Sequence, residues 1–159
     1  MTERQMRPQV QIESPFMAST RDGIAVRVVY LMNAMRHSMF ERGEAPYASH
    51  IINTLVTDDT SALEREIGIE AGLVIGGKAD YTAVYTDLGI SSGMEHGIHR
   101  AEREGRPIVY RLVYNNALSL QELEALIRST SPRPIEAIEA LYGHIHRHIQ
   151  IPALIKQTG

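Results

Sequence analysis

The chain has 159 residues, of which 43% are hydrophobic and 22% are charged. This is ordinary for a globular domain that buries about two-thirds of its unfolded surface. A net charge of −3 and the absence of cysteine give no support for a nucleic-acid-binding protein, a disulfide framework or thiolate catalysis. The polar start MTERQMRPQ is unlike a signal peptide, and no stretch is apolar enough to span a bilayer, so we expect a cytoplasmic protein without a membrane partner.

The first predicted elements alternate between strand and helix. Val10–Glu13 predicts a short strand, and Ile24–Arg42 predicts an amphipathic helix that Gly43 ends. Glu44–His50 predicts a second strand, and the segment 51–59 is expected to be a loop or partly helical. The alternation is typical of a parallel sheet with helical crossovers.

The middle of the chain continues the alternation. Ser61 and Glu64 have the spacing of a capping box, which predicts a helix that runs to Ile75. The next elements are a strand, a helix and a strand, at Tyr81–Thr86, Gly93–Gly105 and Ile108–Leu112. This order predicts an α/β fold with a mainly parallel sheet and helices on both faces.

The last third of the chain predicts helices only. Ser119–Arg128 is a short helix, and Ile135–Ile149 is a second one with a single apolar stripe. We therefore divide the chain into an α/β domain, residues 1–113, and a C-terminal helical extension, residues 114–159. The extension packs either on the same domain or on a partner subunit.

The loop after the third predicted strand has residues suited to a small ligand. In open α/β sheets, ligands bind at the carboxyl ends of the strands. Ser91, Ser92 and Gly93 open the next helix, where free N–H groups favour an anion, and Met94 follows them. Asp87 ends the strand and is suited to hold a ribose hydroxyl or to act as an acid or base. The plain alternatives are a serine N-cap and a turn-forming aspartate.

Further candidate ligand contacts come from other strand ends and helix starts. Ser14 ends the first predicted strand, Arg21 follows it, and His50 ends the second. Arg65 begins a helix close to Asp59, and is suited to bridge to that acid or to a ligand phosphate. The plain alternatives are solvated surface charges and a partly buried histidine.

The histidines do not predict a metal site. Among His144, His146 and His148, only two share a helix face, and no other set of histidines and carboxylates has metal-ligand spacing. We expect no metal and no cofactor.

Six short stretches follow one another in a fairly specific order and spacing. They are Ser14-Pro15-Phe16, Ala45–His50, Asp58-Asp59, Arg65-Glu66, Lys78–Asp80 and Thr86–Pro107. Together they resemble the nucleoside 2-deoxyribosyltransferase superfamily and its relatives, the 2'-deoxynucleoside 5'-monophosphate N-glycosidases. The similarity covers residues 9–113 and is greatest to a poorly characterised branch of phages and bacteria.

The resemblance implies a flavodoxin-like fold, a homo-oligomer, and cleavage or exchange of an N-glycosidic bond in a small nucleoside or nucleotide. In such enzymes a glutamate attacks or stabilises the sugar C1' carbon, and a second acid assists. By position, Glu95 is the candidate nucleophile, and Glu66 and Asp87 are the assisting acids. Ser91 matches a serine that helps to hold the phosphate.

One position departs from the family pattern. An alignment without gaps, counted back from Gly105, puts the catalytic glutamate at Gly97, two residues beyond Glu95. Two residues on a helix correspond to a rotation of about 200°, whereas a two-residue shift in the loop restores Glu95 to the catalytic position. Two functions therefore stay open: an N-glycosidase or deoxyribosyltransferase, and a protein that binds a nucleotide-derived ligand without turnover.

Overall fold

Four strands form one parallel sheet in the computed structural model, which describes residues 6–58, 60–114 and 117–146. The sheet order is β2-β1-β3-β4, which places β1 and β3 in the centre. The strands are β1 (Gln9–Glu13), β2 (Ala45–Tyr47), β3 (Tyr81–Tyr85) and β4 (Ile108–Arg111). The predicted α/β fold with a parallel, flavodoxin-like sheet is confirmed.

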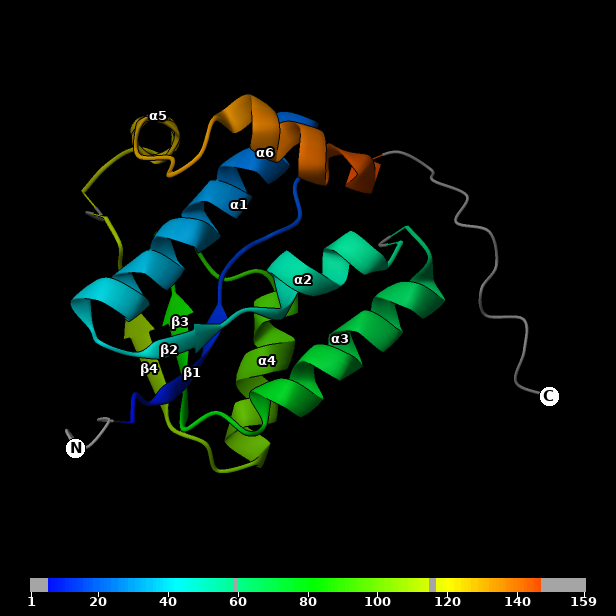
Figure 1. The fold of residues 1–159 in the computed structure, drawn as a ribbon, viewed down its shortest axis with the longest axis vertical. Coiled ribbons are helices and arrows are strands. Elements are labelled where there is room, and N and C mark those ends of the chain that lie inside the picture. Colours follow the sequence, from blue (N-terminus) through cyan, green and yellow to red (C-terminus); the bar gives the residue numbers. More distant parts are fainter. Residues whose placement is uncertain (1–5, 59, 115–116, 147–159) are drawn as a thin grey trace, which may run out of the picture.

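Helices cover both faces of this sheet. Figure 1 shows α1, α5 and α6 on one side and α3 and α4 on the other, with α2 beside α3. The helices are α1 (Arg21–Arg36), α2 (Ser49–Val56), α3 (Ala62–Gly76), α4 (Ser92–Arg103), α5 (Leu120–Ser129) and α6 (Ile135–Tyr142). A π-helical turn, η1 (His37–Glu41), extends α1, and a 3-10 turn, η2 (Gly143–His146), follows α6.

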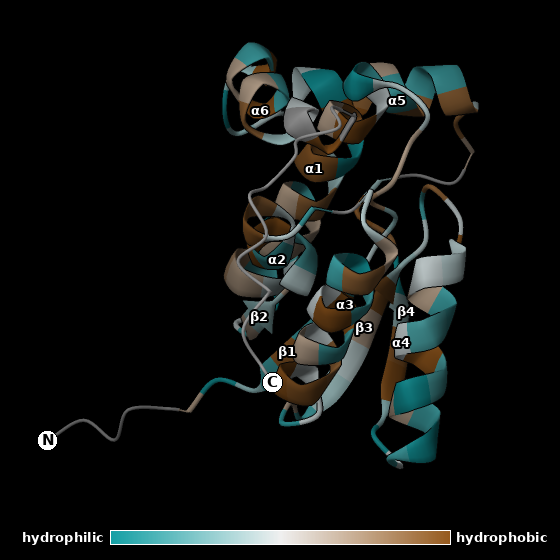
Figure 2. Cartoon of the chain, turned by 90° about the vertical axis from the view of Figure 1, so that its right-hand side faces the viewer, coloured by the Kyte–Doolittle hydropathy of each residue, from teal (hydrophilic) through white to brown (hydrophobic). Residues whose placement is uncertain are grey.

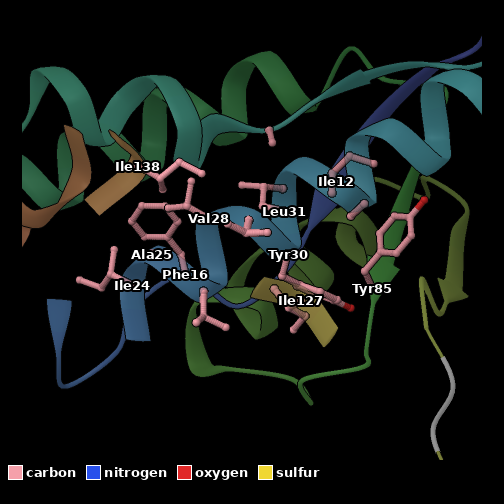
Figure 3. Close-up of a cluster of buried hydrophobic side chains, with 14 of the residues drawn as sticks. Ile12, Phe16, Ile24, Ala25, Val28, Tyr30, Leu31, Tyr85, Ile127 and Ile138 are labelled. Carbon is pink, nitrogen blue, oxygen red and sulfur yellow. The ribbon is translucent and has the colours of Figure 1, made fainter. Parts of the chain in front are cut away.

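Side chains of β1 alternate between the two faces. Val10 and Ile12 are fully buried in the main core. Figure 3 shows Ile12 in this core together with side chains of α1 and of the C-terminal helices. Gln11 and Glu13 have the opposite orientation because side chains alternate along a strand, and they line a cavity beside α3 and α4. In Figure 2 the strands, with α3 and α4 beside them, carry both hydrophilic and hydrophobic residues. The apolar side chains of β1 face the main core, whereas Gln11 and Glu13 face the cavity.

The second strand is shorter than predicted. β2 ends at Tyr47, and α2 begins at Ser49, so His50 lies in the first turn of a helix and not at the end of a strand. The α2 helix has eight residues and no side-chain hydrogen bond at its N-cap, so the sequence contains no start signal for it. Pro46 is compatible with β2 because this strand lies at the sheet edge.

The C-terminal extension packs on α1 in the part that the structure describes. Ile127, Ile138 and Tyr142 are buried in the main core, and Tyr142 Oη donates a hydrogen bond to Ile51 O at 2.9 Å. The α6 helix ends at Tyr142, before the predicted end at Ile149, which is outside the described residues together with the rest of the tail.

Three buried glycines form one face of α3. Gly68, Gly72 and Gly76 are spaced at intervals of four, so they lie on the same side of the helix. A Cβ atom at Gly72 would lie 2.6 Å from Ser49 Cβ, and one at Gly76 would lie 2.7 Å from Gln11 Oε1. The glycines therefore let α2 and β1 approach the α3 backbone, which places all three elements around the cavity described below.

We expect Gly72→Ala to destabilise the protein by about 1–3 kcal/mol, because α2 must move to admit the new methyl group. Gly68→Ala is the matched control, since the nearest atom to its Cβ would be Thr57 Cγ2 at an ordinary 3.4 Å. Alanine is a better helix former by about 1 kcal/mol, so the control should be neutral or stabilising. Urea denaturation of both variants measures the difference, and equal midpoints would contradict the close α2–α3 approach.

Candidate functional site

A half-open cavity lies at the carboxyl end of β1. It has about 930 Å³ of empty space, counting the part that is open to solvent. Its lining comes from the end of β1 and the residues after it, from α2 and α3, and from the first turns of α4. The chain leaves β1 for β2 on one side, and β3 lies on the other, so the cavity is at the switch point where ligands bind in folds of this type.

One wall of the cavity is apolar and aromatic. Phe16, Ile69 and Leu73 line it. The Phe16 ring stacks on the His50 ring, with 5.8 Å between the ring centroids and 26° between the planes. A wall of this kind suits a flat ring in a ligand.

Three buried polar atoms at the cavity have no hydrogen-bond partner among the described residues. They are Gln11 Oε1, Ser14 Oγ and His50 Nδ1. Buried polar atoms are nearly always paired, so three exceptions around one cavity indicate partners supplied by a ligand or by water. Burial lowers the pKa of His50 to about 4, so its ring is neutral at pH 7.

A carboxyl group lies at the floor of the cavity. Glu13 is 4% exposed, and its Oε1 accepts one long hydrogen bond, from Gln11 Nε2 at 3.5 Å. Burial raises the pKa of Glu13 to about 8, because it outweighs the Gln11 hydrogen bond and the charge of Arg106, which both lower it. The carboxyl group is therefore mostly protonated at neutral pH.

The Glu13 carboxyl occupies space beside α4 that a glycine leaves free. A Cβ atom at Gly97 would lie 2.1 Å from Glu13 Oε1 and 2.5 Å from Glu13 Cδ. Gly97 is buried on the side of α4 that lines the cavity. Any side chain at this position would displace the carboxyl group.

The N-terminus of α4 opens onto the same cavity. Ser91 is the N-cap, and its Oγ accepts a hydrogen bond from Met94 N at 3.4 Å. Ser91, Ser92 and Gly93 all line the cavity, and so does Arg65 on α3. The free N–H groups and the guanidinium make this side suited to an anion. Met94 points elsewhere: its buried side chain packs in a small core with Val84.

The three acids proposed from the sequence do not line the cavity. Glu95 is on the exposed side of α4, Glu66 is exposed on α3, and neither is among the described residues of the cavity lining. Asp87 accepts hydrogen bonds from Tyr30 Oη at 2.7 Å and from Val113 N at 2.8 Å. Its carboxylate therefore joins the end of β3 to α1 and to the segment after β4.

Two further candidate contacts are not among the described residues of the cavity lining. Arg21 lies at the start of α1 and forms an ion pair with Glu139 of α6 at 3.7 Å. Asp59 falls outside the described residues. The structure thus brings together Ser14, His50, Arg65 and the start of α4.

Sequence reasoning missed Glu13 and Gln11. A signal was available, because a central strand of a parallel sheet is buried on both faces and is usually apolar throughout. Two polar residues at alternate positions of β1 therefore indicate a polar site on one face of the sheet.

The described residues contain no group of three or more histidine, aspartate or glutamate side chains that could hold a metal ion. Among the helices of the same residues, none combines the length and the apolar character that crossing a membrane requires.

A family model described as a domain of unknown function (DUF7768) matches residues 8–111. The chain belongs to this family. The DUF7768 match includes all four strands and α1 to α4, and therefore every residue that lines the cavity. Searches of curated proteins and of solved structures found no match.

Proposed function

We propose that this protein binds a nucleoside or nucleotide in the cavity and cleaves its N-glycosidic bond, by hydrolysis or by transfer of the sugar. The observation that carries the proposal is the convergence of Gln11 Oε1, Ser14 Oγ and His50 Nδ1, all without a partner among the described residues, on one switch-point cavity. The resemblance to the deoxyribosyltransferase superfamily supports the same reaction class.

The chemistry of the cavity fits the three parts of a nucleotide. The unpaired polar atoms suit sugar hydroxyls, which both donate and accept hydrogen bonds. The start of α4, with Ser91 and Ser92, and the Arg65 guanidinium suit a phosphate. The Phe16 and His50 rings suit a base.

A second function, ligand binding without turnover, has one observation in its favour. Glu95, Glu66 and Asp87, the acids proposed from the sequence, are not among the described residues of the cavity lining. Such a protein would hold a nucleotide-derived ligand unchanged.

Assembly and location stay predictions. The resemblance implies a homo-oligomer, and the described part of α2 and α3 exposes apolar side chains, a feature often found at interfaces. They are Ile52, Leu55, Val56, Leu63, Ile67, Ile69, Val74 and Ile75. We also propose a cytoplasmic location.

The test is to incubate the protein with deoxy- and ribonucleosides and their monophosphates, and to detect free base by liquid chromatography with mass detection. We expect base release from at least one compound. Ile69→Trp should reduce the rate by at least about tenfold, because Ile69 lines the cavity and a larger side chain would fill it. Val74→Trp is the control on the same helix, since Val74 is 53% exposed and is not part of the described lining.

Two results would contradict this proposal in different ways. No free base, with one compound retained by the protein through gel filtration, would favour binding without turnover. Base release that Ile69→Trp leaves unchanged would place the reaction outside this cavity.

A further inference from the structure

The described lining of the cavity contains one acidic side chain. Among the described residues that line it, Glu13 alone carries a carboxyl group. Cleavage of a glycosidic bond commonly depends on a carboxyl group that donates a proton or stabilises positive charge at the sugar. Among the residues that the structure describes, Glu13 is therefore the candidate for that role.

We propose that Glu13, presented by β1, is the catalytic carboxyl group of this cavity, in the space that a side chain at position 97 of α4 would otherwise fill. The inference rests on the proposed function and adds the residue that carries out the reaction. Its geometric basis is the 2.1 Å separation between Glu13 Oε1 and the position of a Cβ atom at Gly97.

The same geometry explains the glycine. Gly97 is the position at which the alignment without gaps places a helix-borne glutamate. The Glu13 carboxyl and a side chain at position 97 compete for one volume, so only one of them can be present. In this chain the carboxyl group reaches that volume from the strand, and the helix carries glycine.

Opposing effects act on the Glu13 carboxyl group, and together they favour its protonated form. The charged or titratable groups around the cavity are His50 on α2, Arg65 on α3 and His96 on α4, and Arg106 contributes its charge from the segment after α4. Burial has the larger effect and raises the pKa of Glu13 to about 8. Glu13 therefore holds a proton that it can donate at neutral pH.

The reaction then balances with water as the second substrate. The Glu13 carboxyl donates its proton to the leaving nitrogen of the base while the C1'–N bond breaks, and the electrons of that bond leave with the base. A water molecule adds to C1' and gives a proton to the Glu13 carboxylate. The products are the free base and the sugar with a new hydroxyl group, and Glu13 returns to its starting state.

The test compares base release by the wild type, Glu13→Gln and Glu102→Gln on the same panel of nucleosides and monophosphates. We expect Glu13→Gln to lower kcat by about 100-fold or more, with little change in ligand affinity by calorimetry. Glu102→Gln is the control, since Glu102 is 57% exposed at the far end of α4. The wild-type rate should fall as the pH rises through about 8, where Glu13 loses its proton.

Thermal unfolding of Glu13→Gln shows whether this variant is folded. If it is not, a second variant keeps the test valid. Gly97→Ala displaces the carboxyl group without removing it, and should lower kcat to a similar degree. If the wild type releases base and a folded Glu13→Gln variant, or Gly97→Ala, releases it at the same rate, the role of Glu13 is overturned and the proposed function stays intact. No base release by the wild type from any compound would overturn both.

Discussion

Replacement of Arg111 by methionine is expected to lower the free energy of unfolding by about 3–5 kcal/mol, because it removes the nearest countercharge of the buried Glu44 carboxylate. Arg42 remains, but its Nε is 3.9 Å from Glu44 Oε1 and its side chain is 54% exposed. Glu44 is 3% exposed. Arg111 donates to both of its oxygens at 2.8 Å, Ser38 Oγ donates to one oxygen at 2.7 Å, and Tyr81 Oη donates to the other. The pair connects β4 with the segment before β2, and the sheet loses this connection when either partner is removed.

The stability from this pair should depend on pH. Burial raises the pKa of Glu44, but the hydrogen bonds from Arg111, Tyr81 and Ser38 outweigh it and lower the pKa to about 2. Because the folded-state pKa is below the unfolded value of 4.5, the contribution is complete above about pH 4.5 and is lost as the pH falls towards 2. The difference between the wild type and Arg111→Met should therefore shrink in acid.

Urea denaturation at about pH 7 and about pH 3 measures this difference. Arg103→Met is the matched control: Arg103 is exposed on α4, and its loss should change stability by less than about 0.5 kcal/mol. The double variant Glu44→Leu with Arg111→Met should recover part of the stability, because it leaves no buried charge. An Arg111→Met variant as stable as the wild type at neutral pH would show that the pair is not buried in solution.

Most elements of the fold follow from local patterns in the sequence. The helices α3 and α4 are capped by Ser61 and Ser91, and Gly105 follows the end of α4. Such signals involve residues within one helical turn of each other, so they can be recognised in the sequence before the fold is known. The α2 helix has no capping side chain, and the sequence predicts its first two residues as the end of a strand and the rest as a loop or partly helical segment.

The place of the candidate site in the fold was predictable from the sequence, but the full set of side chains that line it was not. Strand ends and helix starts meet at one edge of a parallel sheet, and that rule alone brings Ser14, His50 and Ser91 to one cavity. The direction of a side chain on α4 depends on its rotation about the helix axis, which an uncertain two-residue register leaves open. Glu13 and Gly97 are far apart in the sequence, so no local sequence pattern predicts the contact between them.

The buried carboxyl of Glu13 should make the wild type less stable as the pH rises, and Glu13→Gln should remove this effect. The folded-state pKa of about 8 is above the unfolded value of 4.5, so between these values the folded state holds a proton that the unfolded state has released. Stability from this group is therefore fully present below about pH 4.5 and falls until about pH 8. At about pH 9 we expect the variant to be more stable than the wild type by on the order of 2 kcal/mol or more.

Urea denaturation of both proteins from about pH 4 to about pH 9 measures this effect, with Glu95→Gln as the control because Glu95 is exposed on α4. The curves of the wild type and Glu13→Gln should converge in acid and separate in base, whereas the control should follow the wild type throughout. Parallel curves for Glu13→Gln would mean that Glu13 has an ordinary pKa in the folded protein and is ionised at neutral pH. It would then have no proton to donate to a leaving base, and the acid role would have to pass to another group. Separating curves would show that the chain retains a destabilising acid in its cavity, a cost that proteins often accept at functional sites.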